Sequence, residues 1–330
     1  MSKINIKNVA ICMYGQYRTG DACLEYIKRF YECNNVNIDF FCSLKPYETT
    51  YTRQVYNDKN NRELLDQDQL TDKQVSYQHE QINKYFNPKK FKVYSKEYED
   101  ELKDIQRSII HSKVLAGWTD SVMLKQQYEV ENDITYDLVI MQRYDVIVWP
   151  NVAFKMLLDK VQGMNTDERG TIVSADKNFI FCQPIEITRK YDGTFMYPNA
   201  QDLWVWGFGT AMDTLVYDAL EYIPSKYKSN YSDRKFHNGY PFVDTHEMIG
   251  SICRKMTIPY SMFPSVSPAG HVCLPQEYRQ QGIRYTQVAP IPIRTSYFED
   301  GIIPDLATLS NKEIEDLYDN VMLKKWDEGC

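Results

Sequence analysis

The sequence predicts an α/β fold, in which a mostly parallel sheet is flanked by helices. Short continuous apolar runs at residues 9–14, 38–43 and 138–141 are typical of strands that are buried on both faces, as in a parallel sheet. Residues 21–33 and 109–131 place their apolar side chains at helical spacing. Because strands and helices alternate along the chain, these segments indicate βαβ units.

The remaining elements follow from the same two patterns. A polar turn at residues 15–20 joins the first strand to its helix. Residues 45–82 are polar and irregular, which predicts an insertion with short helices. The further predicted elements are strands at 91–94, 171–175 and 203–207, a second apolar run at 146–149, and helices at 210–222 and 243–256.

The strand predicted at residues 203–207 carries two tryptophans. Trp204 and Trp206 alternate with Val205. This alternation indicates a strand with one buried face and one surface face, both of them structural.

Composition limits the class of protein. A chain of 330 residues with 43% hydrophobic and 25% charged residues is typical of a globular protein that buries a full core. No stretch approaches the ~20 apolar residues of a membrane helix, and the first residues lack the apolar core of a signal peptide. We therefore expect a cytoplasmic protein without a membrane partner.

Cysteine usage and charge exclude two further classes of site. The eight cysteines include no C-x-x-C pair, so we expect reduced thiols and no zinc site. The formal net charge of -7 argues against a general electrostatic grip on nucleic acid. A local basic patch stays compatible with this charge.

The most informative stretch is the end of the strand that begins at residue 138. Arg143 and Asp145 follow this buried strand directly. Ligands of open α/β sheets bind at the carboxyl ends of the strands, where an Asp beside an Arg suits a divalent metal that carries a diphosphate. A buried Arg–Asp ion pair that caps the strand is an equally good interpretation.

The turn after the first strand is the second candidate site. Gly15, Gln16 and Arg18 lie between a strand and a helix, where backbone N–H groups and the helix dipole favour an anion. Arg18 adds a positive charge. Taken by itself, a glycine at such a turn is usually only turn chemistry.

Several segments resemble one family when they are taken in order. The segments are CMYGQYRTG, NIDFFCSL, FNPKKFKVY, YDLVIMQRYDV, DLWVWGFGTAMD and DTHEMIGSICRKMTIPY. Together they are similar to GT-A-type glycosyltransferase-like proteins of bacterial surface-polysaccharide loci, giant viruses and tailed phages. The resemblance spans residues 9–265 and implies a GT-A-like, Rossmann-like domain over 1–275 with a polar insertion at about 45–85. Residues 276–330 would form a C-terminal extension that packs on this domain.

The resemblance also implies roles for individual residues. The nucleotide of a UDP-sugar donor would lie against Gly15, Gln16, Arg18 and Arg143. Mn²⁺ or Mg²⁺ would be held by Asp145 and His271. Residues 207–209, with Gly207 and Gly209, would form a glycine loop that lets the backbone approach the sugar and the acceptor, and Asp202 would bind the donor sugar hydroxyls. The catalytic carboxylate would be Glu247, with Asp244 as second choice. Arg143 stands where a first Asp of the D-x-D motif often lies, so one acidic metal ligand is missing.

Each of the later residues also has a structural interpretation. Asp244 and Glu247 open a predicted helix, where acidic side chains compensate the helix dipole. His271 suits a hydrogen-bonded loop histidine at least as well as a metal ligand. A degenerate fold that only binds a nucleotide or carbohydrate is favoured by the missing first Asp.

The acceptor is predicted from a basic stretch and from analogy. Lys226, Lys228 and Arg234 are interleaved with aromatic residues, a pattern that can follow a phosphate backbone and stack bases, although a solvated loop is the usual outcome. The composition resembles that of T4-like phage proteins. The leading expectation is transfer of glucose or arabinose to 5-hydroxymethylcytosine in double-stranded phage DNA, in the host cytoplasm. The alternative acceptor is a surface or lipid-linked saccharide.

Overall fold

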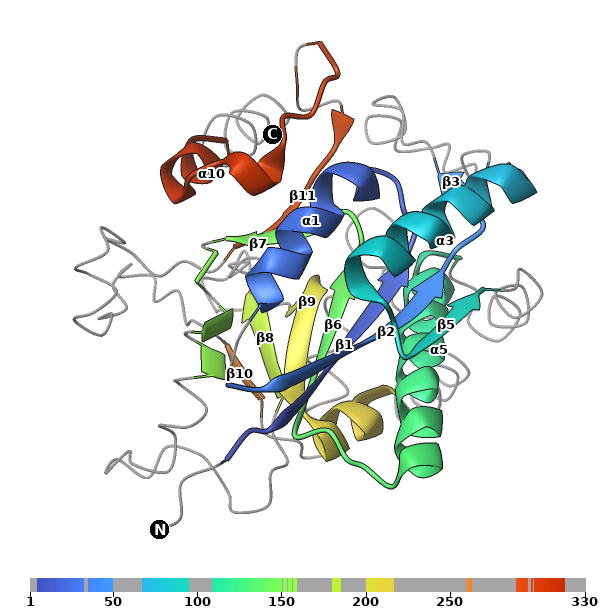
Figure 1. Ribbon diagram of the computed structural model, residues 1–330, viewed down its shortest axis with the longest axis vertical. Coiled ribbons are helices and arrows are strands. Elements are labelled where there is room, and N and C mark those ends of the chain that lie inside the picture. Colours follow the sequence, from blue (N-terminus) through green and yellow to red (C-terminus); the bar gives the residue numbers. More distant parts are fainter. Residues whose placement is uncertain are drawn as a thin grey trace, which may run out of the picture.

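The computed structural model confirms the α/β prediction. It describes residues 5–32, 35–49, 67–94, 109–149, 151–152, 154–155, 157–158, 180–184, 200–216, 260–262, 289–295, 298 and 300–317, and every structural statement below concerns this part of the chain. A mixed, mostly parallel sheet lies at the centre with helices on both sides (Figure 1).

The central sheet has the strand order β10-β8-β9-β6-β1-β2-β5 in the described residues. Its strands are β1 (Asn8–Gly15), β2 (Asn37–Leu44), β5 (Lys90–Val93), β6 (Leu138–Arg143), β8 (Ile180–Pro184), β9 (Ala200–Phe208) and β10 (Tyr260–Met262). β1 pairs in parallel with both β2 and β6, and β2 with β5, whereas β9 runs antiparallel to β6 and β8.

The parallel register brings three strand ends to one edge of the sheet. Tyr14 of β1 lies opposite Ser43 of β2 and opposite Arg143 of β6. The turns that follow β1 and β6 are therefore neighbours in space, although more than a hundred residues separate them in the chain. This edge is where α/β sheets bind ligands.

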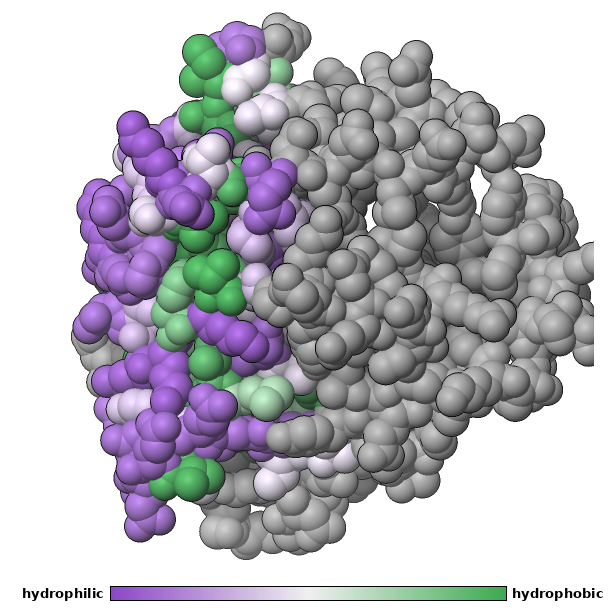
Figure 2. All heavy atoms as spheres, turned by 90° about the vertical axis from the view of Figure 1, so that its right-hand side faces the viewer, coloured by the Kyte–Doolittle hydropathy of each residue, from purple (hydrophilic) through white to green (hydrophobic). Residues whose placement is uncertain are grey.

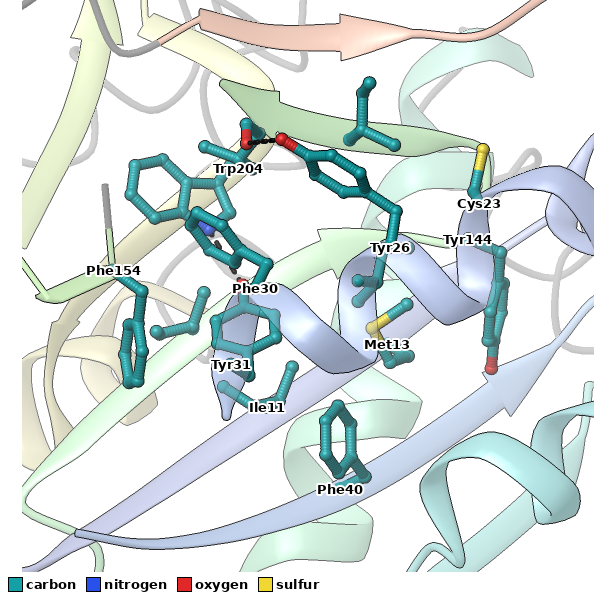
Figure 3. Close-up of a cluster of buried hydrophobic side chains, with 14 of the residues drawn as sticks. Ile11, Met13, Cys23, Tyr26, Phe30, Tyr31, Phe40, Tyr144, Phe154 and Trp204 are labelled. Atoms are coloured by element: carbon teal, nitrogen blue, oxygen red, sulfur yellow. Dashed lines mark hydrogen bonds between the residues drawn. The ribbon is translucent and has the colours of Figure 1, made fainter. Parts of the chain in front are cut away.

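The two faces of β1 pack against different helices. Val9, Ile11 and Met13 belong to the core cluster beneath α1 (Gly20–Tyr31), as Figure 3 shows for Ile11 and Met13. Tyr14, which points to the opposite face, packs edge-on against Trp118 of α5 (Ile109–Asn132). A strand covered on both faces has no solvent-facing side, which is why the first strand reads as a continuous apolar run.

The tryptophan strand departs from its prediction. Trp204, Val205 and Trp206 are all buried, so β9 has no surface face at this point. The Nε1 of Trp204 donates a 2.9 Å hydrogen bond to the hydroxyl of Tyr31 (Figure 3). This hydroxyl in turn bonds to the side chain of Gln142 of β6. β9 lies inside the sheet between β6 and β8, and an interior strand is covered on both faces.

The polar insertion also departs from its prediction. It contains α3 (Asp72–Phe86), a helix of 15 residues, and a small sheet of β3 (Tyr47–Thr49) and β4 (Gln67–Gln69). The sequence signal for α3 is a capping box, in which Thr71 and Gln74 bond each other's backbone N–H groups. Of the helix predicted at 210–222, residues 209–216 are helical. The predicted strand at 171–175 and the predicted helix at 243–256 lie outside the described residues.

The C-terminal part returns to the edge of the sheet that carries the strand ends. β7 (Val146–Trp149) pairs antiparallel with β11 (Ala289–Pro292). The short helix η4 (Leu306–Thr308) lies against α1, and α10 (Asn311–Leu317) lies near β7, where Trp149 donates to the carbonyl of Asn311 (Figure 1). The boundaries proposed for the domain and its extension stay a prediction.

The described surface is mainly hydrophilic on the side shown in Figure 2, where a narrow hydrophobic band crosses it. Among the described helices, none combines the length and the apolar character needed to cross a membrane.

Candidate functional site

The turn after β1 has an unusual backbone. Gly15 ends the strand at φ 101°, a conformation that favours glycine. Arg18 lies at φ 46°, in the left-handed region that side-chain-bearing residues rarely adopt. Such strain persists only where the surrounding structure imposes it, and it concentrates at functional sites.

The turn after β6 buries a carboxylate. β6 ends at Arg143 and β7 begins at Val146, so Tyr144 and Asp145 form the whole connection. Both side chains are fully buried. The hydroxyl of Tyr144 reaches the carbonyl of Ser43 at 3.3 Å, which ties this turn to the end of β2.

Three arginines converge on the Asp145 carboxylate. Arg143 binds it with two hydrogen bonds, from Nε to Oδ1 at 2.9 Å and from one Nη to Oδ2 at 2.8 Å. Arg18 donates to Oδ2 at 2.9 Å and Arg294 donates to the same oxygen at 2.5 Å. Arg18 is held in addition by Gln16, whose side-chain oxygen accepts from its Nε at 2.8 Å. We call Arg18, Arg143, Arg294 and Asp145 the arginine cluster.

The arginines determine the charge state of Asp145. Burial alone would raise the pKa of this carboxyl group, but the positive charges of Arg143, Arg294 and Arg18 outweigh it and hold the pKa well below its ordinary value. Asp145 is therefore ionised throughout the physiological pH range. The cluster holds three cations and one anion.

A second buried carboxylate shows the opposite balance. Asp120 of α5 contacts a single cation, with its Oδ1 at 2.6 Å from the Nζ of Lys92. Its burial raises its pKa, and Lys92 offsets only part of that effect. Asp120 has one lysine as its charged partner, whereas three arginines contact Asp145.

The environment of Asp145 does not fit a metal ligand. A carboxylate offers about four lone-pair sites, and guanidinium N–H groups already make four hydrogen bonds to this one. Within the described ranges, no group of three or more His, Cys, Asp or Glu side chains could hold a metal ion. His271, the second proposed metal ligand, lies outside those ranges.

Arg294 was not predicted as a site residue. Ile293 and Arg294 follow β11, and the backbone of Ile293 joins both turns: its N–H donates to the carbonyl of Asp145, and its carbonyl accepts from Thr19 Oγ1, each at 2.8 Å. The only sequence signal is an arginine directly after a short apolar run, the same pattern that precedes Arg143. The pairing of β11 with β7 cannot be predicted from that signal.

The predicted site residues other than Gly207 fall into three groups. Gln16, Arg18, Arg143 and Asp145 come together as predicted neighbours, next to Gly15 at the end of β1. The backbone of Asp202 lies in β9 beyond Trp204, which pairs with Gln142, and so lies toward the same edge. Asp244, Glu247 and His271 lie outside the described residues.

Gly207 is far from this edge. It pairs with Val139 and Ile180 in the interior of the sheet, because β9 runs antiparallel to β6. The next glycine, Gly209, donates to the carbonyl of Asp137, which precedes β6. The expected glycine loop therefore lies at the amino end of β6, the opposite end from the arginine cluster.

Comparison with known proteins gives only distant similarity. Neither a protein-family model nor a curated protein sequence matches this chain. Among solved structures, mouse xyloside xylosyltransferase 1 in its apo form is similar with a TM-score of 0.35 and 10% identity, over 84% of this chain and 91% of that one. The glycosyltransferase GlyE of Streptococcus pneumoniae TIGR4 is similar with a TM-score of 0.30 and 10% identity, over 78% of this chain and 45% of that one.

A third similar structure is the nucleoside-diphosphate-sugar pyrophosphorylase of Vibrio cholerae RC9, with a TM-score of 0.27 and 8% identity, over 77% of this chain and 90% of that one. TM-scores this low do not establish a shared family.

Proposed function

We propose that this protein is a glycosyltransferase of the GT-A type that moves a sugar from a UDP-sugar to an acceptor hydroxyl. The observation that carries the proposal is the arginine cluster, which gathers at the carboxyl ends of β1 and β6 beside the start of α1. Positive charge at this edge suits the diphosphate of a nucleotide-sugar. The order of sequence motifs supplies the identity of the donor.

The chemistry requires two kinds of group. The acceptor oxygen forms a bond to the anomeric carbon, the bond from that carbon to the diphosphate breaks, and its electron pair leaves with UDP. Guanidinium groups beside the diphosphate stabilise the negative charge that grows there. The acceptor hydroxyl proton passes to a carboxylate, for which Glu247 is the first candidate and Asp244 the second.

The proposal includes two candidate acceptors. 5-Hydroxymethylcytosine in double-stranded DNA remains the leading candidate, and its basic contacts would be Lys226, Lys228 and Arg234, which lie outside the described residues. The net charge of -7 limits any DNA contact to a local patch. A surface or lipid-linked saccharide is the alternative acceptor, and the cytoplasmic location stays a prediction with either.

A panel of UDP-sugars tests this proposal. The protein is incubated with each sugar nucleotide, with Mn²⁺ or with EDTA, and with or without hydroxymethylcytosine DNA, and released UDP is measured. Release of UDP from one donor supports a transferase, and its dependence on DNA identifies the acceptor. Binding of a UDP-sugar with no UDP release under any condition would make the protein a binding module instead.

A further inference from the structure

We propose that Arg18, Arg143 and Arg294 form an oxyanion site that neutralises the diphosphate of the donor without a divalent cation, and that Asp145 is the positioning residue that gathers them. The identity of the donor rests on the proposed function. The anion site itself rests only on the arginine cluster.

The charges of the four side chains in the cluster do not balance. Three guanidiniums surround one carboxylate, so these four side chains carry more positive than negative charge. Each phosphate of a nucleotide-sugar diphosphate carries a negative charge. A diphosphate bound at the cluster would reduce the repulsion among the three cations, and the planar guanidinium matches the geometry of phosphate oxygens.

The arginines of the cluster are accessible to solvent, and Asp145 is not. The carboxylate of Asp145 is fully buried, whereas the side chains of Arg18, Arg143 and Arg294 are exposed by 15%, 19% and 25%. The cluster therefore presents its cations, and not its anion, toward the surface. An ion pair that serves only to cap the strand would need one arginine, and the cluster holds three.

The amino-terminal end of α1 lies beside the cluster. This helix begins at Gly20, two residues after Arg18, and the side chain of its N-cap residue makes no capping hydrogen bond. Thr19, the residue in the capping position, donates its hydroxyl to the carbonyl of Ile293 instead. The positive end of the helix dipole adds to the field of the arginines, and the carboxylate of Asp21 in the first turn offsets part of that contribution.

The divalent cation that the resemblance implies would compete with the arginines for Asp145. The arginines already engage both oxygens of Asp145, so a metal ion at this carboxylate would have to displace guanidiniums. A divalent cation and an arginine cluster can each neutralise the negative charge of the leaving diphosphate. We infer that this chain uses the arginines for it, and that Arg294, supplied by the C-terminal segment, completes the site.

The test uses two anions and the full-length protein. Binding of inorganic pyrophosphate and of UDP is measured by calorimetry in a phosphate-free buffer with EDTA, and again with Mg²⁺ or Mn²⁺. We expect both anions to bind in EDTA, and Arg294→Ala to weaken both by about 10-fold or more, the scale of a charge-assisted contact. The matched control is Arg29→Ala, which removes a surface guanidinium of α1 that pairs with Glu25 and lies outside the cluster.

Arg294→Lys separates folding from recognition. The lysine keeps a positive charge beside Asp145 but lacks the planar guanidinium group, which can donate two parallel hydrogen bonds to phosphate oxygens. Weaker pyrophosphate binding by a lysine variant that melts like wild type supports the site. Pyrophosphate affinity unchanged in both Arg294 variants would overturn it, as would binding of pyrophosphate and UDP only when the metal is added.

The outcomes distinguish this inference from the proposed function. Pyrophosphate binding in EDTA, together with no UDP release from any sugar donor, would sustain the oxyanion site and defeat the transferase. Sugar transfer that stops in EDTA, together with loss of UDP binding, would sustain the transferase and defeat the metal-free site.

Discussion

Asp145 is the residue at which the two interpretations of the sequence meet. A buried carboxylate is costly unless it is paired, and here three arginines pair with it. The sequence suggested Arg143 alone as the ion-pair partner of Asp145, whereas the structure shows three arginine partners. The cost of removing the charge decides which role dominates.

Asp145→Asn is expected to lower the free energy of unfolding by ~3–5 kcal/mol, because three guanidiniums lose the anion that holds them together. The lower end of this range is the better expectation, since each arginine keeps some contact with solvent. Urea unfolding measures the change. A variant that melts like wild type but loses Mn²⁺-dependent turnover would make Asp145 a metal ligand.

The pH dependence of the same variant is a control. Because folding lowers the pKa of Asp145, this group stabilises the folded state above its unfolded pKa of about 3.9 and loses that effect as the pH falls toward its folded pKa. Asparagine does not titrate. The stability gap between wild type and Asp145→Asn should thus be largest above about pH 5 and shrink below about pH 4.

Arg18→Ala is expected to weaken UDP binding by about 1.5–3 kcal/mol, the scale of a charge-assisted contact to phosphate. Calorimetry on wild type, Arg18→Ala and the surface control Arg29→Ala measures this. An affinity for UDP that Arg18→Ala leaves unchanged would remove Arg18 from the nucleotide site.

At the scale of elements, the orientation of β9 decides where the site can be. β9 is antiparallel to β6, so Gly207 and Gly209 lie at the amino end of β6 and the arginine cluster lies at its carboxyl end. A glycine loop next to the donor sugar would require the opposite arrangement.

Gly209→Ala tests this placement. A Cβ on Gly209 would lie 2.4 Å from the carbonyl oxygen of Tyr136, a backbone atom that cannot move without shifting the start of β6. We expect a loss of about 1–3 kcal/mol in the free energy of unfolding, as for an overpacked site, with unchanged UDP affinity per folded molecule. A large loss of UDP affinity in a variant of normal stability would return this glycine to the donor site.

Lys125 joins α5 to the helical segment 209–216. Its fully buried Nζ lies 2.8 Å from a carboxylate oxygen of Glu129 and 2.9 Å from one of Asp213. Burial alone would lower the pKa of Lys125, but the two carboxylates outweigh it and raise the pKa. The amine is therefore charged in the folded protein.

Lys125→Met keeps the length of the side chain and removes its charge. We expect a loss of about 2–4 kcal/mol in the free energy of unfolding, somewhat less than for a fully buried pair, because Glu129 and Asp213 are 16% and 25% exposed. The control is Lys312→Met, whose lysine is 70% exposed and whose loss should leave the free energy of unfolding nearly unchanged. Equal effects of the two substitutions in urea unfolding would contradict a structural role for Lys125.

At the scale of the whole molecule, the acceptor depends on charge. If DNA is the acceptor, charge reversal at Lys226, Lys228 and Arg234 should weaken DNA binding and flatten its dependence on salt, because fewer counterions are released. UDP-sugar binding should survive. Fluorescence anisotropy over a series of salt concentrations measures both the DNA affinity and its dependence on salt.

The matched control reverses three exposed lysines elsewhere, Lys73, Lys84 and Lys312, which changes the net charge of the protein by the same amount. A DNA affinity that responds equally to both triple variants would reflect net charge alone. An affinity that responds to neither would favour the saccharide acceptor.

Local patterns predicted much of the fold. The predicted strands at 9–14 and 38–43 and the helices at 21–33 and 109–131 agree with β1, β2, α1 and α5 to within a few residues. Periodicity determines these elements, because each face of a strand or helix must match its surroundings. α3 is longer than the short helices predicted for the insertion, since its mainly polar sequence hid three buried positions, and its capping box was the usable signal for its start.

The sequence by itself determined which strands lead into charged turns, because the arginines that follow the apolar runs 9–14 and 138–141 are visible without a structure. Only the tertiary structure decided the partners of Asp145. Arg18 is 127 residues away from it in the chain and Arg294 is 149 residues away. The parallel register of β1 and β6 and the pairing of β11 with β7 bring them together. Long-range strand pairing leaves no local trace in the sequence, so an aspartate that reads equally well as a metal ligand or as half of an ion pair acquires its environment only when the sheet is assembled.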